Sequence, residues 1–119
     1  MRMGLRSAAL ALLLALPGTA MAQSGVNWGA IVVGPGGAYG WAINMATEWD
    51  AEQQAFANCG GACTDGYTFY DTCAAIAVNG DYWYIGEGFM QAIAEEEALV
   101  NCEAETGFGC VINVWACTD

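Results

Sequence analysis

Basic side chains are almost absent from this sequence. Its only basic residues are Arg2 and Arg6, histidine does not occur, and 13 Asp and Glu residues give the 119-residue chain a formal net charge of −11. Without histidine or lysine, a Ser-His or Cys-His catalytic pair is impossible. Binding to nucleic acid or anionic lipid depends on Lys and Arg, so we expect neither partner. The charge favours a cationic protein or peptide as partner, although acidity that serves only solubility explains it equally well.

Both arginines lie at the start of a secretory pattern. They precede an Ala/Leu-rich run over residues 7–16, which is too short to span a bilayer as a mature helix, and Ala20-Met-Ala22 follows as a small-x-small motif. This order predicts a signal peptide over residues 1–22, cleaved after Ala22, with a retained uncleaved anchor as the alternative. We therefore expect a periplasmic or secreted protein with no membrane insertion after cleavage.

Removal of 22 residues from 119 leaves a 97-residue chain with 13 acidic groups, no basic side chain and a formal charge of about −13. A domain of this size is only marginally stable unaided. Its six cysteines, an even number, predict stabilising disulfides in an oxidising compartment. Zinc at the Cys59-x-x-x-Cys63 spacing is the disfavoured alternative, and the spacing of Asp65, Asp71 and Asp81 fits no EF-hand calcium loop. We expect no metal and no cofactor.

Two internal repeats make up the chain after a short tail over residues 23–27. The apolar run Trp28-Gly-Ala-Ile-Val-Val33 matches Cys73-Ala-Ala-Ile-Ala-Val78, and the segment 52–59 aligns without gaps with 95–102, with four of eight residues identical. The repeats therefore span 28–73 and 73–117 within a single domain, 28–119. A period of about 45 residues repeated only twice favours a fused pair with one core over a solenoid.

Each repeat predicts the order strand, turn, strand, helix, strand. Asn79-Gly80 is typical of a hairpin turn in which both residues take positive φ. Thr47 with Asp50 resembles a capping box at the start of the first helix. The expected elements are first strands 28–33 and 73–78, second strands 39–43 and 82–85, helices ending at Cys59 and Cys102, and third strands 67–70 and 111–115. The fold class is α+β, a mostly antiparallel sheet with one face covered by two helices.

Helical spacing predicts which side chains the two helices bury. Positions i, i+3/i+4 and i+7 share one face of a helix. The predicted buried faces are Trp49, Phe56 and Cys59 in the first helix, and Ala92, Leu99 and Cys102 in the second.

The duplication also restricts the 15 possible disulfide pairings, because equivalent cysteines should play equivalent parts. Pairs Cys59–Cys63 and Cys102–Cys110 would close each helix end onto the following strand. Cys73 and Cys117 then remain to join the two halves across a long loop. A competing map pairs Cys59 with Cys73.

The order of these motifs resembles that of a bacterial exported family known as a domain of unknown function, DUF4189. The resemblance rests on Trp28-Gly-Ala-Ile31, Tyr39-Gly-Trp41, Cys73-Ala-Ala-Ile-Ala-Val78 and Val114-Trp-Ala-Cys117, and it runs from Trp28 to Cys117. It implies export and duplication, and it implies no activity, catalytic residue or cofactor.

The function that these features favour is a non-enzymatic binding domain with no catalytic residues. Strand alternation sends Tyr82 and Tyr84 to one side and Trp83 to the other, so some aromatic side chains face outward. With Asp81 these three form the predicted binding residues, because aromatic anchors beside rim charges suit a cationic protein such as a basic secreted enzyme. A glycan binder with an aromatic platform is the alternative.

A carboxylate-dependent hydrolase is a further alternative, because that chemistry needs only two acidic groups that flank a cleft. Adjacent carboxylates occur at Glu95-Glu-Glu97, but adjacent helix positions point in different directions, which favours a solvated helix face. The sequence sets no oligomeric state.

Overall fold

The computed structural model describes residues 26–118, so the predicted signal peptide lies outside the described residues. The first repeat contains strand β2 (Trp28–Val33), a 3-10 turn η1 (Pro35–Gly37), strand β3 (Tyr39–Met45), helix α2 (Glu48–Cys59) and strand β4 (Asp65–Tyr70). The second contains β5 (Cys73–Asn79), β6 (Tyr82–Gly88), α3 (Gln91–Thr106) and β7 (Val111–Cys117). Within the described range neither helix is long and apolar enough to cross a membrane.

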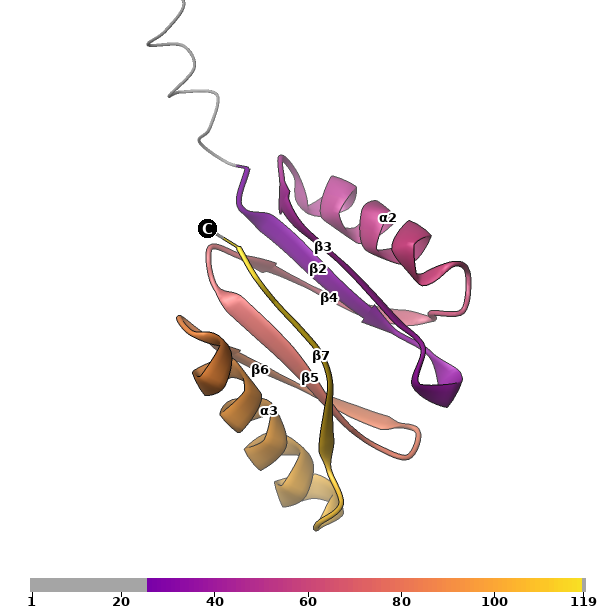
Figure 1. The fold of residues 1–119 in the computed structure, drawn as a ribbon, viewed down its shortest axis with the longest axis vertical. Coiled ribbons are helices and arrows are strands. Elements are labelled where there is room, and N and C mark those ends of the chain that lie inside the picture. The colour runs from indigo at the N-terminus through magenta and orange to yellow at the C-terminus, as the bar shows by residue number, and fades with distance from the viewer. Residues whose placement is uncertain (1–25, 119) are drawn as a thin grey trace, which may run out of the picture.

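The strands form two antiparallel three-stranded sheets, ordered β3-β2-β4 and β6-β5-β7. The sheets face each other, with α2 on the outer face of the first and α3 on the outer face of the second (Figure 1). The α+β prediction is confirmed. The predicted arrangement, one sheet with one covered face, is wrong. Each repeat forms its own three-stranded sheet, and the two sheets bury their inner faces against each other.

The central strands β2 and β5 are the reason for this arrangement. Nearly every residue in both is apolar, so neither strand offers a polar face to water. Ile31 and Ile76 point between the sheets and are fully buried there. Their neighbours point outward instead, where Ala30 and Val32 pack under α2, and Ala75 and Ala77 pack under α3.

Helix α2 approaches its sheet through small side chains. Thr47 Oγ1 accepts a hydrogen bond from Asp50 N at 3.0 Å, which confirms the N-cap half of the predicted capping box. The buried residues are Ala51 and Ala55, whereas Trp49 is 66% exposed, so the predicted buried face is wrong at Trp49. Because the helix backbone lies so close to the sheet, an indole has no room between them.

Helix α3 repeats this packing with Ala94, Ala98 and Cys102, and Ala92 is exposed, contrary to the predicted face. It also continues to Thr106, so the predicted helix end at Cys102 is one turn too early. The Thr106 hydroxyl donates a hydrogen bond to the Cys102 carbonyl, one turn back along the helix, at 2.8 Å.

The asparagine that precedes each of these helix cysteines has the same contact in both repeats. Asn58 Nδ2 donates to Trp41 O at 2.8 Å, and Asn101 Nδ2 donates to Ile85 O at 2.8 Å. Trp41 and Ile85 occupy the edge strands β3 and β6, whose outer backbone groups have no strand partner. These bonds tie each helix to its edge strand and occupy groups that would otherwise invite strand pairing with another chain.

Three disulfides are present, Cys59–Cys63, Cys102–Cys110 and Cys73–Cys117, with Cα separations of 6.0, 6.2 and 3.9 Å. These are the pairs that the duplication predicts, but the role predicted for the third is wrong. Cys73 opens β5 and faces Cys117 at the end of β7, so the bond links two strands of the second sheet and does not join the repeats. It closes the longest loop, with a sequence separation of 44, which the chain-entropy estimate makes worth about 4 kcal/mol.

The close approach of α3 to β6 gives a test at Gly86. A Cβ there would lie 2.2 Å from Ala98 N and 2.3 Å from Ala94 O, and both are backbone atoms. We expect Gly86→Ala to lower the free energy of unfolding by about 1–3 kcal/mol, measured by urea denaturation with the disulfides intact. The control Ala104→Leu adds bulk on the exposed face of α3 and should change it by less than about 0.5 kcal/mol. Equal stability of Gly86→Ala and the parent would contradict this packing.

Candidate functional site

The turns that follow β2 and β5 lie at the same end of the molecule (Figure 1). Together with the start of β4 and part of β7 they enclose a cavity of about 260 Å³, which we call the tip pocket. Its walls come from Val33, Gly34, Pro35 and Gly37 in the first repeat, from Val78 and Gly80–Trp83 in the second, and from Thr64, Asp65 and Asn113. The tip pocket is therefore built by both repeats.

The second-repeat wall is a tight turn. Asn79 pairs with Tyr82, which leaves Gly80 and Asp81 as the two loop residues. Only Gly80 has positive φ (64°), so the prediction of positive φ at both Asn79 and Gly80 is wrong at Asn79. Asn79 belongs to the strand, and its Nδ2 donates to Thr106 Oγ1 at 2.9 Å and to Phe108 O at 3.1 Å. These bonds anchor the turn to the end of α3 and to the loop that follows it.

The first-repeat wall rests on the small disulfide loop. A Cβ at Gly34 would lie 2.0 Å from Ala62 O, so only glycine permits this contact between the turn and the Cys59–Cys63 loop. Thr64 N then donates to Val33 O at 2.9 Å, which starts β4 beside β2. These contacts fix the position of Asp65, the next residue.

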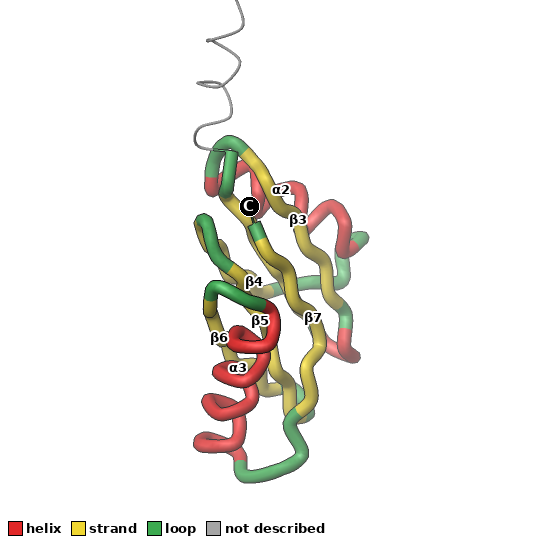
Figure 2. The backbone as a smooth tube through the Cα atoms, turned by 60° about the vertical axis from the view of Figure 1, so that its left-hand side comes forward, coloured by secondary structure: helices red, strands yellow, loops and turns green. Residues whose placement is uncertain are grey.

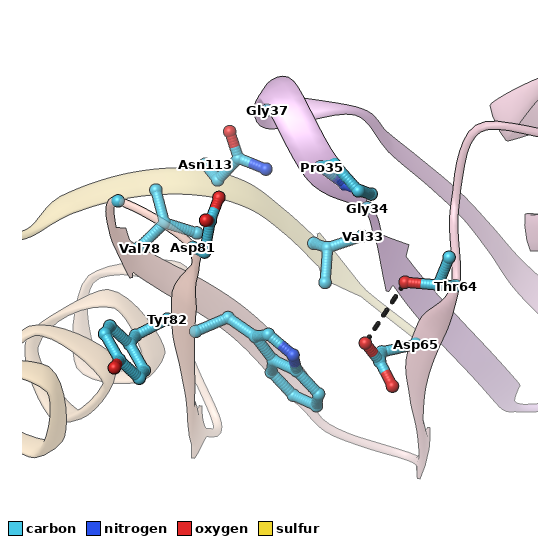
Figure 3. Close-up of a pocket in the computed structure, with 12 residues that line it drawn as sticks. Val33, Gly34, Pro35, Gly37, Thr64, Asp65, Val78, Asp81, Tyr82 and Asn113 are labelled. Atoms are coloured by element: carbon cyan, nitrogen blue, oxygen red, sulfur yellow. Dashed lines mark hydrogen bonds between the residues drawn. The ribbon is translucent and has the colours of Figure 1, made fainter.

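Two carboxylates, one from each repeat, line the tip pocket. Figure 3 shows Asp65 and Asp81 on opposite sides of it, with Thr64 Oγ1 donating to Asp65 Oδ2 at 3.2 Å. Trp83 contributes its indole and also packs against the core between the sheets. Neither repeat contains a basic residue, so residues 26–118 offer no side-chain cation to pair with these acids.

The predicted binding residues divide between two places. Asp81, Tyr82 and Trp83 line the tip pocket, and Tyr82 is 66% exposed. Tyr84 instead packs against the cluster beneath α3, because strand alternation turns it away from Trp83 toward the helix. Asp65 lines the same pocket, although the sequence indicated it only as a weak calcium candidate.

Asn113 is the site residue that sequence reasoning missed. Ile76 pairs with Val114 and Ala77 with Ile112, so Asn113 is the extra residue of a β-bulge in β7. A bulge redirects a side chain, and here the amide lines the tip pocket. Its Nδ2 is buried and has no hydrogen-bond partner among the described residues. The available signal was one amide within the apolar run Val111–Trp115.

A second hollow, the β3–β7 groove, lies between the facing edges of the two sheets, where β3 and β7 run close together (Figure 2). It measures about 430 Å³ and is lined by Tyr39, Trp41 and Ile43 of β3 and by residues 113–117 of β7. Tyr39 is 51% exposed and Trp41 is 44% exposed. Asn113 lines both this groove and the tip pocket.

The remaining acidic candidates do not form a site. No group of three or more Cys, Asp or Glu side chains within residues 26–118 could hold a metal ion. Glu95 accepts a hydrogen bond from Gln91 Nε2 at 3.0 Å, Glu97 Oε1 accepts one from Glu87 N at 2.6 Å, and Glu96 is exposed. The three adjacent glutamates thus point in different directions, as their helical positions predict.

Glu87 lies where β6 of the second sheet faces β4 of the first. The Tyr67 hydroxyl donates a hydrogen bond to Glu87 Oε2, which connects the two sheets. Burial, with a further contribution from the negative charge of Glu97, raises the pKa of Glu87 above its ordinary value of 4.5. The folded protein therefore binds a proton at Glu87 more readily than the unfolded chain does.

The raised pKa of Glu87 determines how its contribution to folding stability changes with pH. The contribution of Glu87 is fully present below its ordinary pKa and is lost as the pH rises through its raised pKa. We expect Glu87→Gln, which keeps an acceptor for Tyr67, to gain stability relative to the parent between pH 4.5 and pH 7. Urea midpoints at the two pH values measure this, with exposed Glu103→Gln as the control. A stability difference that is the same at both pH values would contradict the assignment.

Comparison with known proteins identifies relatives of this chain. A 92-residue segment, 77% of the chain, is 34% identical to the uncharacterized proteins Rv1813c of Mycobacterium tuberculosis and Mb1843c of Mycobacterium bovis, and it spans 61% of their length. The NMR structure of Rv1813c matches with a TM-score of 0.61 and 28% identity, over 99% of this chain and 98% of that one. The profile of the domain of unknown function DUF4189 matches residues 28–117, and the chain therefore belongs to the DUF4189 family.

Proposed function

We propose that this chain is an exported, non-enzymatic domain that binds a basic protein or peptide, with the tip pocket as its anchor point. The observation that carries the proposal is the pocket itself, where Asp65, Asp81 and Trp83 meet in a chain whose repeats have no basic residue. A guanidinium or ammonium group suits this pocket, because the two carboxylates can pair with it and the indole face attracts it.

The surface of the described residues as a whole has the same character. Twelve of the 13 acidic residues lie within the described residues, and the exposed aromatic side chains include Tyr39, Trp41, Tyr82 and Trp115. Net negative charge steers a cationic partner and speeds encounter, whereas aromatic anchors hold it once bound. Long-range charge therefore supplies the on-rate in this proposal, and the tip pocket supplies specificity.

A glycan-binding platform is the second candidate, and one observation favours it. Tyr39 and Trp41 lie on the groove-facing side of β3 with exposed rings, an arrangement that suits stacking on a sugar. Salt separates the two candidates, because charge pairing weakens as the Debye length falls below about 5 Å near 0.5 M salt, whereas stacking on a neutral sugar does not. The prediction that the chain is not an enzyme remains a prediction.

The test is calorimetric binding of an arginine-rich peptide to the disulfide-intact protein at low salt. We expect Asp65→Asn with Asp81→Asn to weaken binding by at least about tenfold, or ~1.4 kcal/mol, because both removed charges line the pocket. The matched control Glu96→Gln with Glu103→Gln makes the same change in net charge on exposed positions of α3 and should weaken it by less than about threefold.

Equal losses in the two double variants would show that the peptide senses only overall charge and would contradict a specific anchor. A parent protein that prefers a neutral peptide of the same length at low salt would refute the proposed function altogether.

A further inference from the structure

The groove between β3 and β7 differs from the opposite seam, where β4 faces β6. Ile31 pairs with Trp41 and Tyr67, and its counterpart Ile76 pairs with Ile85 and Val114. By this register Val114 takes the place of Tyr67, and Ile43, two residues beyond Trp41, takes the place of Glu87.

This substitution changes the chemistry of the seam. At one seam Tyr67 and Glu87 are joined by a hydrogen bond across the sheets. At the other the same places hold Ile43 and Val114, which have no polar side-chain groups to form that bond. The β3–β7 seam accordingly has a groove with the exposed rings of Tyr39 and Trp41 on one side.

Asn113 connects this groove to the tip pocket. Its side chain lines both hollows, and its buried Nδ2 lacks a hydrogen-bond partner among the described residues. An unpaired buried donor costs about 1–3 kcal/mol, so an acceptor placed there by a ligand would be favoured. The bulge in β7 thus places an unpaired hydrogen-bond donor on the residue that lines both hollows.

We propose that a single extended stretch of basic peptide occupies both hollows, an inference that rests on the proposed function of the tip pocket. Its arginine or lysine enters the tip pocket between Asp65 and Asp81. A main-chain carbonyl of the same peptide accepts the hydrogen bond from Asn113 Nδ2. The next residues run along β7 in the groove, and one apolar side chain packs on Trp41.

Four features favour a peptide over a sugar chain in this track. The two carboxylates need a cation, which a neutral glycan lacks, and a peptide carries a carbonyl at every residue. Residues 113–117 of β7 cover about 13 Å at ~3.3 Å per residue, so about five residues of extended peptide match the groove. The backbone amide of an extended chain can also lie flat against an aromatic ring.

The experiment compares a short probe with a long one by calorimetry on the disulfide-intact protein. The short probe is acetyl-arginine amide. The long probe is a capped hexapeptide with arginine at one end and leucine at the other, made in both orders with alanine between. We expect the better hexapeptide to bind at least tenfold more tightly than acetyl-arginine amide.

Variants then assign the gain to the groove. Trp41→Ala and Asn113→Ala should each weaken hexapeptide binding about fivefold or more. Trp41→Ala, which lies outside the tip pocket, should leave acetyl-arginine amide unchanged. Trp49→Ala, at an exposed indole on α2 outside both hollows, is the matched control and should change neither probe. Tyr39→Ala provides an independent groove variant if Trp41→Ala does not fold.

The outcomes distinguish the two proposals. If the hexapeptide binds no more tightly than acetyl-arginine amide, or if the groove variants leave its affinity unchanged, the extended track is wrong while the anchor stands. If a neutral oligosaccharide binds the groove more tightly than the hexapeptide, the track is also wrong. If the double variant Asp65→Asn with Asp81→Asn changes the affinity for neither probe, the proposed function itself is wrong.

Discussion

The burial of β2 and β5 on both faces is the constraint on which the rest of the structure depends. Each strand is an apolar run with no polar face, so each needs cover on two sides. The outer cover is a helix that presents alanines, and the inner cover is the other repeat, across the contact that includes Ile31 and Ile76. One repeat alone would expose its inner sheet face to water, which explains why two copies form one domain.

The same constraint places the candidate site. Because the two sheets pack with their first hairpin turns at one end, features that lie far apart in the sequence converge there (Figure 1). The repeats have also diverged at this end. The first supplies a five-residue loop backed by the Cys59–Cys63 loop, and the second supplies a two-residue turn that carries Asp81. Because the two repeats share a scaffold but differ in their turns, the pocket between them is asymmetric. Two identical repeats would give a pocket with identical walls.

Sequence reasoning predicted the features that local chemistry determines. The Thr47 cap follows from orphaned helix amides, and the cysteine pairs follow from the duplication. It failed where burial depends on how closely a helix packs against its sheet, as at Trp49. Spacing along the sequence does not reveal that the helix will approach the sheet through alanine and glycine. It also missed Asn113, because a bulge depends on the register between strands, which only the assembled sheet determines. That Asp65 and Asp81 line the same pocket could not be predicted either, because it depends on how the two sheets pack together.

The central claim is that a cationic ligand binds in the tip pocket and not over the acidic surface in general. The most direct measurement is an NMR titration of the ¹⁵N-labelled, disulfide-intact protein with acetyl-arginine amide at low salt. The account predicts saturable shifts at the amides of Gly34, Asp65 and Asp81 and at the Trp83 indole N–H. Small, non-saturating shifts spread over the acidic positions of α2 and α3, with none concentrated at these four groups, would contradict it.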